Sequence, residues 1–355
     1  MVPKKEMKKE KGKQVISVVV PFYNAEKTLQ LCLEAIEAQT LKPSEIIMVD
    51  NGSTDESADI AKAFVKKEPD IFKYVLENKS GPACARNSGA NKSHGNIIVF
   101  TDSDCVPSKN WLRKLVIGFS HFHIGAVAGK VESYKAKTLY DKFHAIFTLK
   151  GFTKLNIFSE FSLVRGGFPT ANLAVRSDVF KKIRGFDETL PIYSEDYDLC
   201  ARIYQIGCSI KYLPEAIVYH QHRNTLKGTW RQAFGFGTGH SLLLKKHFKR
   251  LIIIDLPKFQ FITKWLPLRI WLDAAGADKK LLLIILLSII WRPATILICL
   301  FLLYLFFDMS NQLKKNDLSA GFFKKWQLIF LLFLKSTALT VGRIKGSISN
   351  RVICI

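Results

Sequence analysis

Over the first 220 residues, apolar positions follow two alternating patterns. Unbroken β-branched and aliphatic runs predict strands that are buried on both faces, at Val15–Val20, Glu45–Val49, Tyr74–Leu76 and Asn96–Thr101. Between these runs apolar residues recur at helical spacing, first at Leu29, Leu33 and Ile36. Strand and helix therefore alternate, which predicts an α/β fold around a largely parallel sheet.

Polar residues mark the predicted helix starts. Asn24 is suited to cap the first helix, and Ser53 and Glu56 have the spacing of a capping box for the second. Another helix is predicted from Gly81-Pro82, and one more starts near Ser194. Short strand-like pieces surround this last helix, at Ala126–Val131, Leu173–Val175, Ser209–Tyr212 and Ala216–His220.

The pattern changes after residue 241. Leu242–Leu272 mixes basic residues with tryptophans and aliphatic residues, which is typical of an interfacial helix. Leu281–Phe307 follows and is long enough, at ~1.5 Å per residue, to cross a hydrocarbon core of ~30 Å. Arg292-Pro293 interrupts it, since a mid-span Arg costs roughly 2.5–3.5 kcal/mol and Pro breaks a helix.

A simple crossing would place four lysines on the outer side, against the positive-inside tendency: Lys314, Lys315, Lys324 and Lys325. A re-entrant hairpin bent at Arg292-Pro293 keeps them inside. Trp326–Val341, which contains Lys335, would be a second shallow or re-entrant element. The alternative is a buried helical core, which the length of the run and its basic flanks disfavour.

Charge supports a membrane contact. The chain carries a formal net charge of +22, and residues 221–355 hold 21 Lys and Arg against five Asp, which leaves only +6 for the first 220 residues. A basic segment rich in Leu, Ile and Phe favours membrane lipids as partners and not nucleic acid, because its aromatic residues do not interleave with Arg on a polar face. Seven scattered cysteines and no secretory signal predict a reducing, cytoplasmic setting.

The strongest local motif is Asp102-Ser103-Asp104, directly after a predicted strand. Two carboxylates in a turn can converge on one hard cation, and Mg²⁺ and Mn²⁺ take such oxygen ligands together with substrate phosphates. Asp50 also follows a strand, and ligands of α/β sheets sit at these strand ends. Both sites have a structural alternative. Asp102-Ser103-Asp104 could be an Asp-rich turn that caps the next element, and Asp50 could be a loop residue that hydrogen-bonds its own backbone.

Further candidates come from helix starts. Arg86 could bind a diphosphate as a planar cation, or form a surface salt bridge. Glu195, Asp196 and Asp198 share the first turn of one predicted helix. They could simply complement the helix dipole, with Asp198 and Arg202 forming an i,i+4 pair. Alternatively, the crowded carboxylates could raise one another's pKa and so provide a general base.

Two further motifs are weaker. His220 and His222 end a predicted strand, where a histidine could be a ligand, and the alternative is a core or surface residue that binds nothing. Gly235–Gly239 does not predict a phosphate loop, because no strand precedes it and His240 stands where a dinucleotide fingerprint needs glycine.

Five co-linear blocks together resemble the family 2 glycosyltransferases, an inverting group with a GT-A (Rossmann-like, nucleotide-diphospho-sugar transferase) fold: Val15–Leu29, Ile46–Ser57, Gly81–Cys105, Thr170–Glu188 and Tyr193–Ile203. The resemblance implies a nucleotide-sugar donor, commonly a UDP-sugar. It places Pro21, Tyr23 and Glu26 around the base, with Asp50 hydrogen-bonded to it. Arg86 would lie by the base or the diphosphate.

The same resemblance assigns the chemistry. Within Asp102-Ser103-Asp104 it places Asp102 at the ribose side and Asp104 on the Mg²⁺ or Mn²⁺ ion, and His220 would touch the metal or the phosphate. It makes Asp196 the base. The QxxRW motif of processive synthases is absent from the sequence, which favours transfer of a single sugar.

The resemblance divides the chain into a charged tail expected to be disordered (1–14), a GT-A catalytic domain (15–240), a basic amphipathic interfacial region (241–280) and C-terminal membrane-embedded helices (281–355). A membrane position implies a lipid-linked or cell-surface glycan acceptor, with the catalytic domain on the cytoplasmic side of the cell membrane. The alternative is a nucleotidyltransferase or an inactive nucleotide-sugar-binding module on the same fold. The first would carry a glycine-rich loop that Pro21–Thr28 lacks, and the second would have lost a metal acid or the base.

Overall fold

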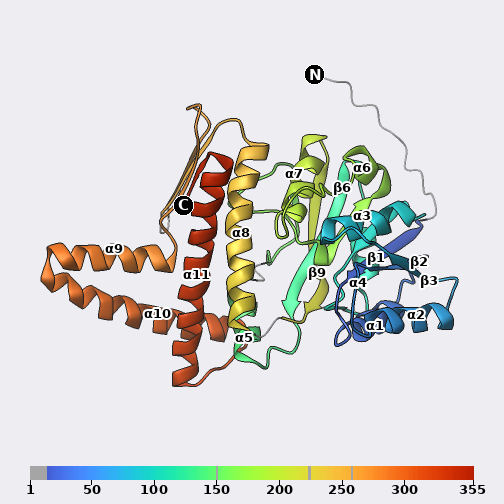
Figure 1. The fold of residues 1–355 in the computed structure, drawn as a ribbon, viewed down its shortest axis with the longest axis horizontal. Coiled ribbons are helices and arrows are strands. Elements are labelled where there is room, and N and C mark those ends of the chain that lie inside the picture. Colours follow the sequence, from blue (N-terminus) through green and yellow to red (C-terminus); the bar gives the residue numbers. More distant parts are fainter. Residues whose placement is uncertain (1–13, 149–150, 223–224, 257–258) are drawn as a thin grey trace.

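A computed structural model describes residues 14–148, 151–222, 225–256 and 259–355 (Figure 1). The tail predicted to be disordered lies, except for Gln14, outside these residues. A nine-stranded sheet forms the centre of the N-terminal part, in the order β3-β2-β1-β4-β8-β6-β9-β5, with β7 paired to β9. Its strands are β1 (Ile16–Phe22), β2 (Glu45–Asp50), β3 (Phe72–Leu76), β4 (Ile97–Phe100), β5 (Cys105–Pro107), β6 (Ile124–Ser133), β7 (Asn156–Phe158), β8 (Leu173–Arg176) and β9 (Ser209–His220).

The predicted strands are confirmed, but the sheet is mixed. β3, β2, β1 and β4 are parallel, as expected for alternating strands and helices. β8 then runs antiparallel to both β4 and β6, and β5 and β7 run antiparallel to β9. The prediction of a largely parallel sheet is therefore wrong for the second half, because apolar patterning identifies a strand without fixing its partner or direction.

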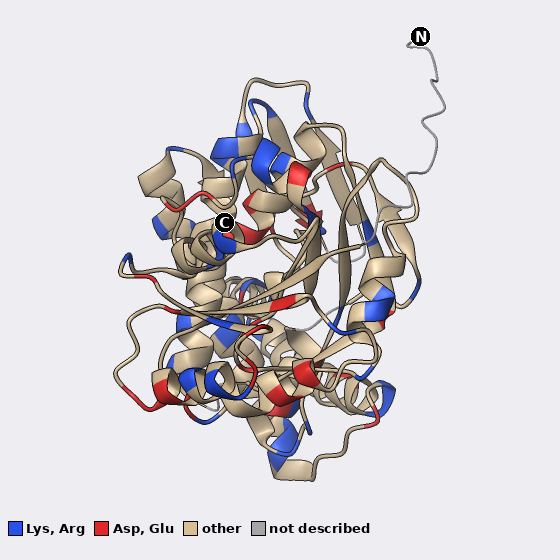
Figure 2. Cartoon of the chain, turned by 90° about the vertical axis from the view of Figure 1, so that its right-hand side faces the viewer, with Lys and Arg blue, Asp and Glu red and all other residues tan. Residues whose placement is uncertain are grey.

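Helices cover both faces of this sheet (Figure 1). One face packs against α1 (Leu29–Glu37), α2 (Ser57–Lys67) and α4 (Trp111–Ile117). The opposite face packs against α3 (Pro82–Lys92), α6 (Ser177–Lys182) and α7 (Glu195–Gln205). Seen from the right-hand side of that view, acidic and basic residues are interspersed (Figure 2), consistent with the small net charge of this part of the chain.

Two predicted helix caps are wrong. Asn24 has a left-handed backbone (φ +48°), and α1 begins only at Leu29. Ser53 and Glu56 form no capping box, and α2 begins at Ser57. The polar side chains instead join the β1–α1 and β2–α2 loops, since Asn24 N donates to Ser53 Oγ (3.1 Å) and Thr54 N donates to Asn24 Oδ1 (2.8 Å).

The interfacial helix predicted over 242–272 is also wrong. α8 (Leu226–His247) contains only its first residues, so the predicted boundary at residue 240 falls inside a helix. The rest forms β10 (Leu251–Leu256), β11 (Phe259–Thr263) and β12 (Arg269–Asp273). These strands form a second sheet with β13 (Ile353–Cys354), in the order β11-β10-β12-β13. Strands of this segment pair with one another, and β12 also pairs with β13, whose residues lie 83 positions farther along the chain.

The C-terminal part continues through α9 (Ala277–Ile290), a short 3-10 turn at Arg292–Thr295, α10 (Ile296–Lys315) and α11 (Phe322–Asn350). α9 and α10 form a hairpin that bends at Arg292-Pro293, as predicted, and projects away from α11 (Figure 1). α11 packs along α8, and α5 (Leu139–Phe147) lies near its first half. Arg292–Lys315 and Phe322–Asn350 are each long and apolar enough to cross a membrane.

Candidate active site

The candidate site lies where β1, β2 and β4 end and where the first turn of α7 approaches them. Asp50 is the last residue of β2 and is only 2% exposed. Its Oδ1 accepts a hydrogen bond from Ser53 N and its Oδ2 accepts one from Tyr74 Oη, both at 2.8 Å. Burial and this bond raise the pKa of Tyr74 to about 12. The structure thus shows the local backbone role for Asp50, and its contact with a nucleobase stays a prediction.

The other predicted base-contacting residues surround the first loop. Pro21 is half-buried at the end of β1, Tyr23 is 62% exposed, and Glu26 is exposed. The Glu26 backbone N–H donates to Asp55 Oδ2 (3.1 Å), and Ala25 N donates to Ser57 Oγ (2.7 Å). These bonds fix the β1–α1 loop beside the β2–α2 loop, so that both border the space above the strand ends.

Arg86 joins the two halves of the site. Its guanidinium is buried, and it donates to Asp102 Oδ1 (Nη2, 2.8 Å) and to Glu195 Oε1 (Nη1, 3.0 Å). Burial would lower the pKa of Arg86, but the charges of Asp102 and Glu195 raise it above its ordinary value. The alternative of a surface salt bridge is wrong, because the pair is internal and links α3 to the start of α7. The predicted contact of Arg86 with the donor stays a prediction.

Asp196 follows Glu195 and is half-buried at the start of α7. Its Oδ1 accepts a hydrogen bond from Tyr197 N at 2.8 Å. Burial and the charge of Glu195 raise the pKa of Asp196 to about 7, while the charge of Arg86 opposes this shift. A carboxylate with a pKa near neutrality can accept a proton and release it again at physiological pH, which is the property of a general base.

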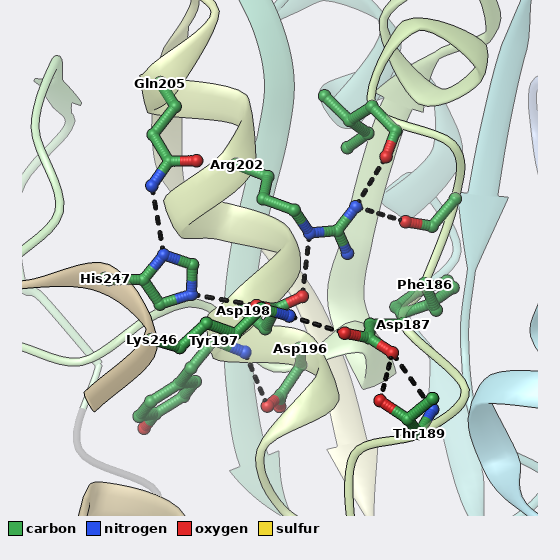
Figure 3. A network of polar contacts seen from close by, with 12 residues as sticks. Phe186, Asp187, Thr189, Asp196, Tyr197, Asp198, Arg202, Gln205, Lys246 and His247 are labelled. Atoms are coloured by element: carbon green, nitrogen blue, oxygen red, sulfur yellow. Dashed lines mark hydrogen bonds and ion pairs between the residues drawn. The ribbon is translucent and has the colours of Figure 1, made fainter. Parts of the chain in front are cut away.

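Asp198, the third acid of this turn, belongs to a structural network (Figure 3). It is fully buried and receives hydrogen bonds or ion pairs from Arg202 Nε (2.7 Å), Lys246 Nζ (2.6 Å) and His247 Nε2 (2.8 Å). Lys246 also pairs with Asp187 Oδ2 at 2.6 Å. Burial alone would raise the pKa of Asp198, but the bonds from His247 and Lys246 outweigh this effect. The pKa of Asp198 is therefore lower than its ordinary value, and the group stays ionised. The i,i+4 pair is confirmed, and the network holds α7 against the end of α8.

Asp104 and His220 form a candidate metal site. β5 pairs with β9 so that Cys105 lies opposite His220, and the ligand atoms of Asp104, Cys105 and His220 lie within 4.8 Å of one another. His220 Nε2 is 3.4 Å from Asp104 Oδ1. Burial and the charges of Asp104 and Asp102 raise the pKa of Cys105 well above its ordinary value, which keeps the thiol protonated. Mg²⁺ and Mn²⁺ prefer oxygen and imidazole ligands, so Asp104 and His220 fit such an ion best.

The chain is similar to several known glycosyltransferases. Residues 17–184 match the family model described as glycosyl transferase family 2. The probable glycosyltransferase YdaM of Bacillus subtilis is 29% identical over 92% of this chain and 74% of its own length. Glycosyltransferase AglE of Haloferax volcanii is 31% identical over 59% of this chain and 67% of its own length. The chain belongs to glycosyl transferase family 2 and is a glycosyltransferase.

Solved structures show the GT-A fold that this family membership implies. A mannosyltransferase, PcManGT from Pyrobaculum calidifontis in complex with GDP-Man and Mn²⁺, superposes with a TM-score of 0.51 at 20% identity, over 65% of this chain and 64% of that chain. S. aureus TarS in complex with UDP-GlcNAc gives a TM-score of 0.50 at 18% identity, over 66% and 67% of the two chains.

The family match covers only part of the candidate site. Asp50, Arg86, Asp102, Ser103 and Asp104 lie inside residues 17–184, whereas Asp196 and His220 lie beyond them. The structure joins Asp102 to Arg86 and joins Asp104 to His220, so the two acids of one motif face different partners. Ser103 lies half-exposed between them.

Two further histidines lie beside the candidate metal site, and the sequence did not indicate that their rings would pack together. The ring of His222 lies 4.8 Å from that of His220, and the ring of His144 on α5 stacks on His222 at 4.7 Å. Burial lowers the pKa of His222 to about 2 and that of His144 to about 4. His144 had no signal in the sequence, because only the fold brings α5 to the end of β9.

Proposed function

We propose that this glycosyltransferase moves a single sugar from a nucleotide-diphosphate donor, most simply a UDP-sugar, to a hydroxyl of a lipid-linked or cell-surface glycan acceptor, with inversion at the anomeric carbon. The observation that carries the proposal is Asp196, a half-buried carboxylate with a pKa raised to about 7 beside the buried Arg86–Glu195 pair. The GDP-Man and UDP-GlcNAc named for the two solved structures support this donor class.

On the donor side, the linked β1–α1 and β2–α2 loops would hold the nucleotide, with Pro21, Tyr23, Glu26 and Asp50 around the base. Asp104 and His220 would hold Mg²⁺ or Mn²⁺, and Asp102 and Ser103 would lie on the ribose side. A bound divalent ion supplies charge neutralisation for the departing diphosphate. Arg86 fixes Asp102 from within, since both of its terminal nitrogens already bind protein carboxylates.

On the acceptor side, Asp196 takes the proton of the attacking hydroxyl. The new bond joins the acceptor oxygen to the anomeric carbon, while the bond from that carbon to the diphosphate oxygen breaks. Attack from the face opposite the leaving group inverts the anomeric configuration. General-base assistance of this kind contributes roughly 10²–10⁴-fold to a rate.

We also propose that the chain attaches to the cytoplasmic face of the membrane. The α9–α10 hairpin, which lies in the predicted membrane-embedded part 281–355 except for the first turn of α9, would enter the bilayer. The second sheet, which lies in the predicted interfacial part 241–280 except for β13, would contact its surface. In support, Trp265 is 91% exposed, Phe259 and Phe261 are exposed beside Lys264, and Ile289 and Ile290 are exposed at the hairpin tip. Aromatic residues with basic neighbours favour the membrane–water interface.

Replacement of the base tests the proposed function. We expect Asp196→Asn to lower transfer by roughly 10²–10⁴-fold with unchanged affinity for UDP, since the amide keeps the shape but cannot take a proton. Asp178→Asn is the matched control, because Asp178 also starts a helix and accepts a hydrogen bond from the next backbone N–H, Val179 N, at 2.8 Å. Transfer from UDP-sugars and UDP calorimetry in detergent, with Mn²⁺ and with EDTA, provide the measurements. Full turnover in Asp196→Asn would refute the base, and full turnover in EDTA would refute the metal.

A further inference from the structure

The contacts that fix the first turn of α7 in space come from the two carboxylates on either side of Asp196. Asp196 itself accepts a hydrogen bond from the next backbone N–H, Tyr197 N, at 2.8 Å, which is a bond within its own helix. Glu195 binds Arg86 of α3 at 3.0 Å, and Asp198 binds the last turn of α8. Because a helical turn is rigid, the position of Asp196 depends on the partners of its two neighbours.

Lys246 and His247, in the last turn of α8, hold Asp198 from outside its own helix (Figure 3). Lys246 Nζ and His247 Nε2 both contact Asp198 Oδ1, at 2.6 and 2.8 Å. The side chains of Asp198 and His247 are 0% and 3% exposed, so little water competes for this contact. Gln205 Nε2 lies 3.0 Å from His247 Nδ1, so the amide donates to this nitrogen and the imidazole presents its Nε2–H to Asp198. Bonds of this kind to an ionised carboxylate are short and directional, which fixes where Asp198 lies.

Lys246 also closes a ring of contacts that returns to α3. Its Nζ pairs with Asp187 Oδ2 at 2.6 Å, in the loop between α6 and α7. The preceding residue, Phe186, is bonded to the Asn87 side chain of α3: Phe186 N donates to Asn87 Oδ1 at 2.8 Å, and Asn87 Nδ2 donates to the Phe186 carbonyl at 2.9 Å. Asn87 directly follows Arg86, so both ends of the ring lie on neighbouring residues of α3. The first turn of α7 is therefore enclosed by α3, this loop and α8.

From these contacts we infer that Lys246 and His247 are positioning residues for the base. They act through Asp198 and set the distance from Asp196 to the acceptor hydroxyl without touching a substrate. The inference rests on the proposed function, in which Asp196 is the base. A displacement of about 1 Å at a reacting group can lower a rate by roughly 10²-fold. Since α8 also packs against α11, the C-terminal helices share in the placement of the base.

UDP-sugar turnover by the full-length protein in detergent, measured per UDP-binding site, tests the inference. We expect Lys246→Met and His247→Leu each to lower kcat by roughly 10–100-fold, while UDP calorimetry finds as many sites as in the wild type. Lys246→Arg and His247→Gln keep a donor toward Asp198 and should recover most of the rate. Lys245→Met is the matched control, because Lys245 is exposed in the same turn of α8 and the change removes the same charge.

The same substitutions in the Asp196→Asn background separate positioning from stability. Residues that act through one group are not additive, so His247→Leu should have little further effect on the residual turnover of Asp196→Asn. An equal loss of turnover in both backgrounds would overturn the inference. Wild-type turnover in Lys246→Met and His247→Leu, or a loss of UDP sites in parallel with turnover, would also overturn it. Full turnover in Asp196→Asn alone would instead refute the base, and with it the proposed function.

Discussion

At the start of α7, three acids share one helical turn and face three different surroundings. Glu195 contacts the buried Arg86, Asp198 is fully buried among cations, and Asp196 receives one backbone hydrogen bond. The dipole of a helix N-terminus stabilises all three charges. Their partners therefore decide their pKa values: the pKa of Asp198 is lowered and that of Asp196 is raised.

This arrangement predicts the pH dependence of transfer. Because Asp196 acts as the base only when ionised, kcat/KM should fall as pH drops below about 7. Glu195→Gln removes a negative charge that raises the pKa of Asp196, so the acidic limb of the profile should move to lower pH. Glu34→Gln, at an exposed site on α1, makes the same change in net charge and should leave the limb in place. A limb that moves to higher pH in Glu195→Gln would contradict the assignment.

At the scale of elements, glycines of α8 allow close packing against two neighbours. One is the start of α7, which carries Asp196, and the other is α11. A Cβ added at Gly235 would lie 2.3 Å from Tyr193 Cδ2, and one added at Gly239 would lie 2.4 Å from Ser194 Oγ. Tyr193 and Ser194 are the two residues that precede α7. A Cβ at Gly237 would lie 2.2 Å from the Leu339 carbonyl of α11. The glycine-rich segment is thus a packing surface between helices, in agreement with the sequence-based rejection of a phosphate loop.

The close approach of these helices makes a specific stability prediction. Gly237→Ala should destabilise the protein by about 1–3 kcal/mol, because the new methyl group meets backbone atoms that cannot move aside easily. Gly321→Ala is the control, since nothing lies within 4 Å of a Cβ there and its φ is negative. Thermal unfolding in detergent measures both. Equal midpoints for the two variants would show that the α8–α11 contact is looser than the structure indicates.

On the scale of the whole molecule, the hairpin and the second sheet offer the bilayer two kinds of contact. α11 packs against α8 on one side, whereas the tip of the α9–α10 hairpin is exposed (Figure 1). Apolar insertion of the hairpin is insensitive to salt. Attraction between anionic lipids and basic residues beside the second sheet, such as Lys264, is screened by salt. The hairpin should therefore carry attachment at high ionic strength.

Cysteine labelling in intact cells tests this topology. Asn311 is exposed near the end of α10, and a re-entrant hairpin keeps Asn311→Cys on the cytoplasmic side. It should react with a membrane-impermeant maleimide only after the cells are opened. Ile290→Cys, at the exposed tip, should be protected by lipid in both conditions. Cys299→Ser removes the native thiol exposed on α10. Labelling of Asn311→Cys from outside would favour a simple crossing.

The sequence by itself determined the strands of the main sheet except the three-residue β5 and β7, the start of α7 and the bend at Arg292-Pro293. It also determined family membership through motifs such as Asp102-Ser103-Asp104. These features depend on residues close together in the chain, whose periodicity and backbone preferences are local. The two predicted helix caps failed because their side chains bond to another loop instead of to their own helix.

Tertiary structure alone decided which residues meet. Arg86 is a buried link between Asp102 and Glu195, which no local pattern indicated, and its contact with the donor stays a prediction. The predicted interfacial helix is instead a set of strands that pair with one another and, through β12, with the last residues of the chain. The partners lie 16 and 109 residues apart in the two ion pairs, and 83 residues apart in the strand pair. Burial and charge at such a distance cannot be read from local patterns, since the free energy of each group depends on neighbours that only the fold supplies.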